Sequence, residues 1–195
     1  MKAYHGDRVY LKEVTEADIT EDVMKWFKDE ELMKYYTNSK QAITREKLLN
    51  SIEEGKVKGN LFTFGIYSAE EDLLIGTIKL GPIHQVHKTS DLVILIGDRN
   101  FLGKGLSVDA IKLGNQLAFE EFDIRKLYGG MYESNIPSIK AYTRAGWLVE
   151  GRLKGFYWVE NRNEDRILVG CFNPKYFSQN EIDEVASSQD RFYKW

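Results

Sequence analysis

The segment Asp98-Arg-Asn-Phe-Leu-Gly-Lys-Gly-Leu106 is the part of the chain that most restricts its fold. It follows an apolar run at residues 92–96, which predicts a buried strand, and it precedes a helical pattern at residues 107–122. A strand that leads through a glycine-containing turn into a helix favours anion binding, because the N–H groups of the turn and the positive end of the helix converge. Gly103 and Gly105 allow the backbone to approach such a ligand closely. The segment therefore predicts a phosphate-binding turn, although such turns also serve as plain connections.

Two common nucleotide-binding motifs do not fit this turn. A Walker loop requires Gly, four residues and then Gly-Lys-Ser/Thr, but Gly97 lies one residue too far from Gly103, and Gly105 replaces the hydroxyl residue. A dinucleotide fingerprint requires a third glycine where this chain has Val108. Neither motif therefore accounts for the turn.

A second motif begins 30 residues after Gly105 and reads Asn135-x-x-Ser138-x-x-x-Tyr142-x-x-x-Gly146-Trp147. In their order and spacing, the two motifs resemble the acyl-CoA-binding motifs of the GNAT acetyltransferases. The resemblance covers roughly residues 9–172. It is strongest to the RimJ/RimL-like branch, including members from bacterial surface-polysaccharide gene clusters. The family usually has Gln or Arg three residues before the first glycine, where this chain has Asn100.

The composition is that of one soluble globular domain of 195 residues, with 43% hydrophobic and 29% charged residues. A net charge of -3 and the lack of a basic run argue against nucleic acid as a partner. The single cysteine, Cys171, excludes an intramolecular disulfide and a cysteine-cluster metal site. No apolar run approaches the ~18 residues of a membrane span, and no apolar stretch follows the N-terminus. We therefore expect a cytoplasmic protein without a membrane partner or a bound metal.

The resemblance implies an α/β (α+β) fold with a mixed, mostly antiparallel central sheet of about seven strands, flanked by helices and splayed at its central strands. Residues 1–172 would form one acyl-CoA N-acyltransferase domain, and residues 173–195 a C-terminal tail or terminal helix of the same domain. A packed helix, a homodimer contact and a frayed tail remain alternatives for that end. The apolar pattern also predicts helices at residues 22–36 and 44–54, the second ended by Gly55.

In this family the glycine turn and the strand before it bind acetyl-CoA as a co-substrate. The residues that the resemblance assigns to this role are Ile94, Leu95, Ile96, Leu102, Gly103, Lys104, Gly105, Leu106, Ser107, Asn135 and Ser138. The splay of the strand would free backbone groups of residues 94–96 for the pantetheine arm and the thioester oxygen. Asn and Ser at a helix start are also common caps, so a capping role for Ser138 stays open. A solvated position for Lys104 stays open as well.

Tyr142 is the candidate general acid, because a phenol with a pKa of about 10 can protonate the departing thiolate. It lies seven residues after Asn135, two turns along the same helix face, where a packing role is the alternative. The candidate general bases are Asp91, at the start of the central strand, and His84, which lies near His87 in the preceding loop. Proton transfer through water, or an amine that is already neutral, would make a base unnecessary.

Aromatic residues that could stack on a sugar or nucleobase ring of the acceptor are Trp26, Tyr35, Tyr36, Tyr157 and Trp158. They lie on segments that border the acceptor side in this family, and together with the resemblance to polysaccharide-cluster members they favour a small-molecule amine acceptor, an amino sugar carried on a nucleotide. We expect direct attack in a ternary complex, because the only cysteine, Cys171, lies in a buried-looking strand. A ribosomal-protein N-terminus, polyamines and antibiotics are the alternative acceptors. A CoA-binding module without catalysis is the alternative from a different functional class.

Overall fold

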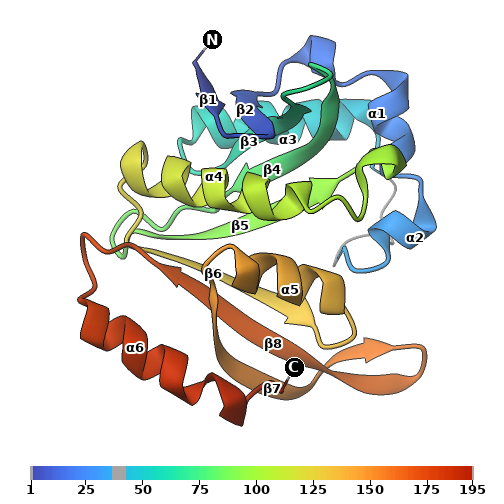
Figure 1. Ribbon diagram of the computed structural model, residues 1–195. Helices are drawn as coiled ribbons and strands as arrows, with labels where there is room; N and C mark the ends of the chain where they lie inside the picture. Colours follow the sequence, from blue (N-terminus) through green and yellow to red (C-terminus); the bar gives the residue numbers. More distant parts are fainter. Residues whose placement is uncertain (1, 37–42, 195) are drawn as a thin grey trace.

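The computed structural model describes residues 2–36 and 43–194, and eight strands of this part form one sheet (Figure 1). Across the sheet their order is β1 (Ala3–His5), β2 (Val9–Glu13), β3 (Phe62–Ser68), β4 (Leu74–Leu80), β5 (Thr89–Ile96), β6 (Lys126–Tyr132), β8 (Arg162–Phe172) and β7 (Leu148–Val159). All neighbouring strands are antiparallel except β5 and β6, which run parallel. This arrangement confirms the expected fold class, and β1 at the edge adds one strand to the approximate number expected.

The sheet opens between its two central strands. β5 and β6 pair only where they begin, residues 89–91 of β5 with residues 126–128 of β6. Beyond Asp91, β5 continues to pair with β4 as far as Ile96, while β6 pairs with β8 along its length. The two strands diverge toward their carboxyl ends in Figure 1, so the expected splay is present.

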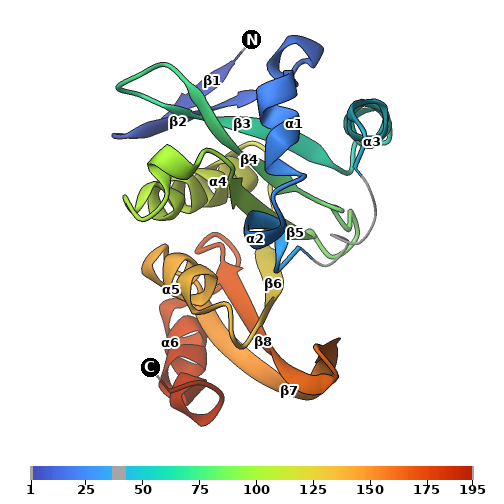
Figure 2. The same cartoon turned by 90° about the vertical axis from the view of Figure 1, so that its right-hand side faces the viewer.

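Helices cover both faces of the sheet, as Figure 2 shows. On one side lie α4 (Leu106–Glu120), α5 (Ile136–Arg144) and α6 (Gln179–Ser188), and on the other lies α3 (Arg45–Val57). Short 3-10 helices occur at Glu16–Asp18, Arg99–Phe101 and Gln189–Arg191. Gly114 permits α4 to lie directly on the sheet, since a Cβ there would come within 2.5 Å of Ile78 and 3.3 Å of Leu92. The helix start is thereby fixed above the opening.

Two predicted helices differ from those observed. The pattern at residues 22–36 forms two short helices, α1 (Glu21–Trp26) and α2 (Glu30–Met33). A new helix begins after Asp29, whose side chain accepts a hydrogen bond from the N–H of Leu32 and caps α2. α3 continues through Gly55 instead of ending there. Gly55 serves close packing, because a Cβ at this position would lie 2.7 Å from Leu61.

The C-terminal segment lies against the sheet. α6 contacts β7, and the side-chain oxygen of Gln189 accepts a hydrogen bond of 2.9 Å from the N–H of Val149. Trp195 lies outside the described residues, and the division of the chain at residue 172 stays a prediction. Of the helices within the described ranges, none is both long and apolar enough to cross a membrane.

Candidate active site

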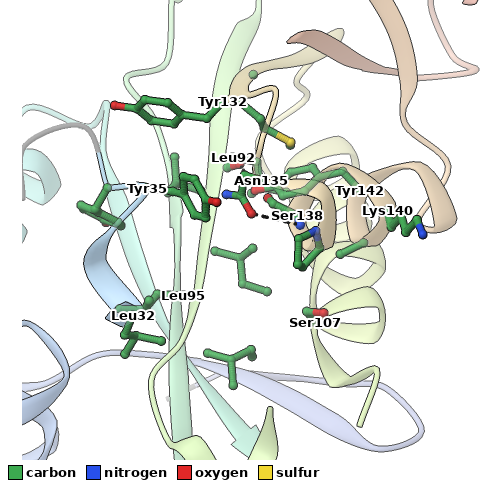
Figure 3. A pocket seen from close by; sticks show the side chains of 18 of the residues that line it. Leu32, Tyr35, Leu92, Leu95, Ser107, Tyr132, Asn135, Ser138, Lys140 and Tyr142 are labelled. Atoms are coloured by element: carbon green, nitrogen blue, oxygen red, sulfur yellow. Dashed lines mark hydrogen bonds between the residues drawn. The ribbon is translucent and has the colours of Figure 1, made fainter. Parts of the chain in front are cut away.

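A cavity of about 1000 Å³ occupies the opening between β5 and β6. It follows β5 from Asp91 to Ile96 and is bounded by β6 and by the starts of α4 and α5. Figure 3 shows Leu95 of β5 across this space from Ser107 at the start of α4, while Leu92 lies close to Asn135 and Tyr142. The splay therefore creates a site between the two parts of the sheet, one ending at β5 and the other at β6.

The glycine turn forms one end of the cavity. Gly103 and Gly105 have φ angles of 73° and 77°, a left-handed conformation that favours glycine, and Gly105 is the N-cap of α4. A Cβ at Gly103 would meet nothing within 4 Å, so the space above it is open. The N–H groups of residues 103–107 donate no turn or cap hydrogen bond within the described chain. Together with the positive end of α4, these donors suit a pyrophosphate.

Arg8, outside the cavity, holds the turn from behind. Its guanidinium donates to the carbonyl of Lys104 at 3.0 Å, to that of Gly105 at 3.4 Å and to the carboxylate of Asp109 at 2.6 Å. In a trans peptide the carbonyl and the next N–H point in opposite directions. Arg8 therefore turns the N–H groups of Gly105 and Leu106 away from itself and toward the cavity.

The free edge of β5 is formed by alternate peptide groups. The carbonyl of Asp91 accepts a hydrogen bond of 3.1 Å from the N–H of Gly81 on the β4 side. Because N–H and C=O directions alternate along a strand, the peptide groups of Leu95 also face β4, whereas those of Ile94 and Ile96 face the opening. Leu95 therefore contributes its side chain to the cavity wall, and Ile94 and Ile96 present the backbone groups.

Tyr142 closes the narrow end of this free edge. Its hydroxyl donates a hydrogen bond of 2.6 Å to the carbonyl of Leu92, and the N–H of Ile94 faces the same phenol oxygen. The ring is 4% exposed and stands edge-on to Trp147. Burial, with the negative charge of Asp91 added, raises the pKa of Tyr142 well above its usual range. The phenol therefore keeps its proton at neutral pH and lies beside the open edge (Figure 3).

Asp91 lines the cavity at the point where β5 and β6 separate. Burial raises the pKa of its carboxyl from 3.8 to about 6, against the opposing effects of the N–H of Leu92 and the charge of Arg166. A carboxylate with this pKa is a stronger base than an ordinary aspartate and is still ionised at neutral pH. Asp91 is thus suited to accept a proton from an ammonium group.

Three of the five aromatic residues expected at the acceptor line this cavity, namely Tyr35, Tyr36 and Tyr157. The hydroxyl of Tyr35 donates to the carbonyl of Ser134 at 3.2 Å, which ties the α2 segment to the loop after β6. Tyr157 stacks on Tyr132, with ring centres 3.8 Å apart, and Tyr35 lies 5.6 Å from the same ring. The result is an aromatic wall at the end away from the glycine turn.

Four expected site residues lie elsewhere. The ring of Trp26 packs on Gly97, where a Cβ would come within 2.0 Å of it, and Trp158 is 69% exposed on the β7–β8 hairpin. His84 is exposed and stacks on His87. Its β-bridge to Thr89 holds it at the start of β5, before the cavity begins.

The fourth is Lys104, which borders a separate, smaller cavity with its ammonium 4.8 Å from the Phe101 ring centre. The remaining expected CoA contacts line the cavity: Ile94, Leu95, Ile96, Leu102, Gly103, Gly105, Leu106, Ser107, Asn135 and Ser138.

The capping role at α5 belongs to Asn135. Its side-chain oxygen accepts a hydrogen bond of 3.3 Å from the N–H of Ser138, as Figure 3 shows. Ser138 lies in the first turn of the helix, so it is the residue that is capped, and its side chain is left for the cavity. Asn135 still has its amide nitrogen available for a ligand.

Sequence reasoning did not identify Arg166, Lys79 or Tyr132, although all three line the cavity. They lie on different strands and belong to no local motif. One signal was present: Gly129 and Gly130 stand next to each other within a strand, which often marks a close approach by another group. The guanidinium of Arg166 lies over Gly130, since a Cβ there would fall 1.8 Å from its Nε.

Within residues 2–36 and 43–194, no group of three or more His, Cys, Asp or Glu side chains is arranged to hold a metal ion. The polar groups that line the cavity include peptide N–H donors, hydroxyls and charged side chains. Such groups suit anion binding and proton transfer.

Known proteins with similar sequences are N-acetyltransferases by name. Residues 8–148 match the sequence model of a family described as the acetyltransferase (GNAT) domain. The Bacillus subtilis (strain 168) protein named probable N-acetyltransferase YjcK is 27% identical over 140 residues, which are 72% of this chain and 75% of that protein. The spermidine N(1)-acetyltransferase of Escherichia coli (strain K12) is 27% identical over 106 residues, 54% of this chain and 56% of that protein.

Solved structures share the fold. The spermidine N-acetyltransferase of Vibrio cholerae, in complex with CoA and spermine, superposes with a TM-score of 0.77 at 19% identity, covering 88% of this chain and 99% of that chain. The ribosomal-protein-S5-alanine acetyltransferase of Vibrio fischeri has a TM-score of 0.76 at 17% identity, covering 91% and 100%.

Proposed function

This chain belongs to the GNAT acetyltransferase family and is an acetyl-CoA-dependent N-acetyltransferase, and we propose that a primary amine attacks the thioester directly at the free edge of β5. The observation that carries the proposal is the opening between β5 and β6, where unpaired backbone groups, Tyr142 and Asp91 meet in one cavity. This arrangement holds both substrates at once, in a ternary complex.

Acetyl-CoA would lie along the α4–α5 side of the opening. The N–H groups of residues 103–107 receive the pyrophosphate, and the pantetheine arm extends along β5 like an added strand. Its amides pair with the peptide groups of Ile94 and Ile96. The thioester carbonyl then reaches the N–H groups of this edge, which stabilise the negative charge that develops on its oxygen.

The amine nitrogen attacks the carbonyl carbon and the carbon–sulfur bond breaks. Asp91 accepts the proton that the nitrogen loses, directly or through a water molecule, and Tyr142 donates the proton that the departing thiolate gains. Solvent exchange then returns both groups to their starting states. The products are an N-acetyl amide and CoA with a free thiol.

An acetyl-enzyme intermediate would need a nucleophile at the cavity, and cysteine does not supply it. The single cysteine, Cys171, is buried in β8 and does not line the cavity. Burial raises the pKa of its thiol to about 12, so almost no thiolate is present at neutral pH. Direct transfer between two bound substrates is the simpler path.

The acceptor that fits the aromatic wall is an amine carried on a ring, such as an amino sugar linked to a nucleotide. Tyr35, Tyr36 and Tyr157 offer flat faces for stacking at the end of the cavity away from the glycine turn. A polyamine is the second candidate, because the chain is similar to spermidine N(1)-acetyltransferases. A protein N-terminus is the third, on the likeness to the ribosomal-protein-S5-alanine acetyltransferase.

An acetyl-CoA consumption assay tests this function. Release of free CoA thiol is followed for nucleotide-linked amino sugars, spermidine and ribosomal-protein N-terminal peptides, and mass spectrometry locates the acetyl group. We expect turnover with an amine and saturation by both substrates with intersecting kinetic lines, which indicate a ternary complex. Parallel lines, together with an acetylated protein intermediate, would contradict direct transfer.

A further inference from the structure

The acceptor end of the cavity contains a cation that the transfer chemistry does not use. Arg166 of β8 lines the cavity, and its Nε is buried without a hydrogen-bond partner in the described part of the chain. A buried donor left unpaired is unfavourable, and guanidinium groups usually pair with oxyanions. The structure thus places at the cavity a guanidinium whose hydrogen-bonding capacity is not fully used.

The surroundings of Arg166 hold it in place. The guanidinium lies over Gly130, where only a glycine leaves room for it, and its Cζ is 4.9 Å from the centre of the Phe156 ring. Arg166 is the cross-strand partner of Tyr132, so both side chains lie on the same face of the sheet. The ring of Tyr132 stacks on Tyr157, which makes this the face that bears the aromatic wall.

A second cation, Lys79, lies on the same face. Ile78 contacts the Cβ position of Gly114 in α4, and alternation along β4 directs the next residue, Lys79, away from that helix. Lys79 lines the same cavity, with its Nζ 5.9 Å from the ring centre of Tyr36. Arg166 and Lys79 therefore flank the acceptor end from the two parts of the sheet.

Acidic groups do not balance these cations. Glu164, near Arg166 on β8, is already engaged, since it accepts from the N–H of Ser134 at 2.9 Å and from its hydroxyl at 2.6 Å. Asp91 and Glu31 both line the cavity, but Asp91 has the role of base and Glu31 is exposed on α2. A polyamine calls for several unpaired carboxylates, and this surface does not supply them.

We propose that Arg166, assisted by Lys79, binds an oxyanion on the acceptor, so that the substrate is an amine that also carries a phosphate or a carboxylate. This inference rests on the proposed function, because it places the amine at Asp91 and the anion at Arg166 in one bound molecule. The planar guanidinium matches either oxyanion with two parallel hydrogen bonds, which fixes the orientation of the acceptor. A nucleotide-linked amino sugar meets this requirement through its diphosphate.

The first test compares acceptors that differ only in the anion. Glucosamine 6-phosphate is set against glucosamine, and glycine against glycinamide, which separates phosphate from carboxylate recognition. We expect at least a tenfold preference in kcat/KM for one anionic member, expressed mainly in KM. Arg166→Met should abolish the preference, and Arg166→Lys should restore part of it. Arg162→Met is the control, since Arg162 is exposed on the same strand and lies 3.9 Å from Glu160, outside the cavity.

The second test does not depend on turnover. Uridine diphosphate and N-acetylglycine are titrated into protein saturated with CoA, so that the glycine turn is occupied. We expect at least one of them to bind, with affinity tenfold or more lower in Arg166→Met and unchanged in Arg162→Met. Failure of both to bind, or equal binding in Arg166→Met at an unchanged melting temperature, would overturn the inference. So would a preference for spermidine that Arg166→Met leaves unaltered, although acetyl transfer itself would then stand. If no amine consumes acetyl-CoA, the proposed function fails and the titration alone decides the anion site.

Discussion

The two ends of the cavity are built from different parts of the chain. At the glycine turn, the donors are backbone N–H groups of one continuous segment, residues 103–107, supported from behind by Arg8. At the acceptor end, the surface consists of side chains from α2, β4, β6, β7 and β8. A site made of backbone depends on conformation and tolerates side-chain changes, whereas a site made of side chains can change its ligand by substitution. The first end suits an invariant co-substrate and the second a variable acceptor.

The largest effect is expected at the backbone-built end. Gly105→Asp should weaken acetyl-CoA binding about a thousandfold, roughly 4 kcal/mol, because it strains a left-handed position, and because a Cβ there lies 3.5 Å from the Arg8 guanidinium, so the new carboxylate draws Arg8 away from the carbonyls that orient the turn. Isothermal titration with CoA measures the loss. Gly59→Asp is the matched control, since Gly59 has a φ of 63°, open space around it and no place in the cavity. Equal CoA affinity in the two folded variants would show that the turn is only a connection.

Tyr142 lies where the two ends meet, and Tyr142→Phe should lower kcat about a hundredfold with little change in the KM for acetyl-CoA. The variant removes the proton donor and keeps the ring. It also leaves the carbonyl of Leu92 without its partner, so a melting temperature should be measured beside the rate. Tyr67→Phe is the control, because it removes a buried phenol that donates to Asp18 at 2.7 Å, away from the cavity. A similar small rate loss in both variants would reduce Tyr142 to a packing residue.

Asp91→Asn should lower kcat/KM about tenfold to a hundredfold at pH 8, since water can replace part of a base. The wild-type rate should rise with pH through about 6 as the carboxyl loses its proton, and this limb should be absent in the variant. A wild-type profile that is flat between pH 5 and 7, with chemistry rate-limiting, would remove Asp91 as the base.

The same carboxyl predicts a stability effect of known sign. Its folded-state pKa is about 6, above the unfolded value of 3.8, so the folded state binds the proton more tightly. The stability that the protonated form contributes is present below pH 3.8 and is lost as the pH rises through about 6. Asp91→Asn should therefore be more stable than wild type at pH 8, by at most about 3 kcal/mol, and should match it at pH 3.5. Urea unfolding at the two pH values gives the difference.

The smallest effect is expected from one aromatic residue of the side-chain end. Tyr157→Ala should raise the KM for the acceptor about tenfold, because it removes the ring that stacks on Tyr132. Trp158→Ala should change this KM by less than about twofold, since the ring of Trp158 is exposed and lies outside the cavity. The reverse order would place the acceptor on the outer face of the hairpin.

This contrast also explains what the sequence could predict. The glycine turn is local, so Gly103, Gly105 and the following helix were identified from their order along the chain. The sequence did not identify which peptide groups of β5 face the opening. The register with β4 decides that those of Ile94 and Ile96 do so, rather than those of Leu95. A spacing motif specifies which strand supplies donors and leaves open which residues do so.

At the acceptor end, sequence analysis identified residue types but not positions. Aromatic content suggested Tyr157 and Trp158 equally, and only strand alternation separates the ring in the cavity from the exposed one. Arg166 gave no local signal, since its role depends on a glycine 36 positions earlier in a neighbouring strand. Contacts between distant segments follow from the fold, and local sequence patterns therefore could not predict them.

An unpaired strand edge normally invites another chain to pair with it, and proteins protect such edges with charges, prolines or bulges. Beyond Asp91, the edge of β5 that faces away from β4 pairs with no described strand. It belongs to the apolar residues 92–96, a sequence typical of aggregating segments. Its protection is positional, because it lies inside the sheet with β6 on one side and α4 and α5 above. A slender extended arm can enter this space, but a folded neighbour with its own sheet cannot. The protein thus keeps an unpaired strand edge in its interior, where its position and the hydrogen bond from Tyr142 to Leu92 protect it from pairing with another chain.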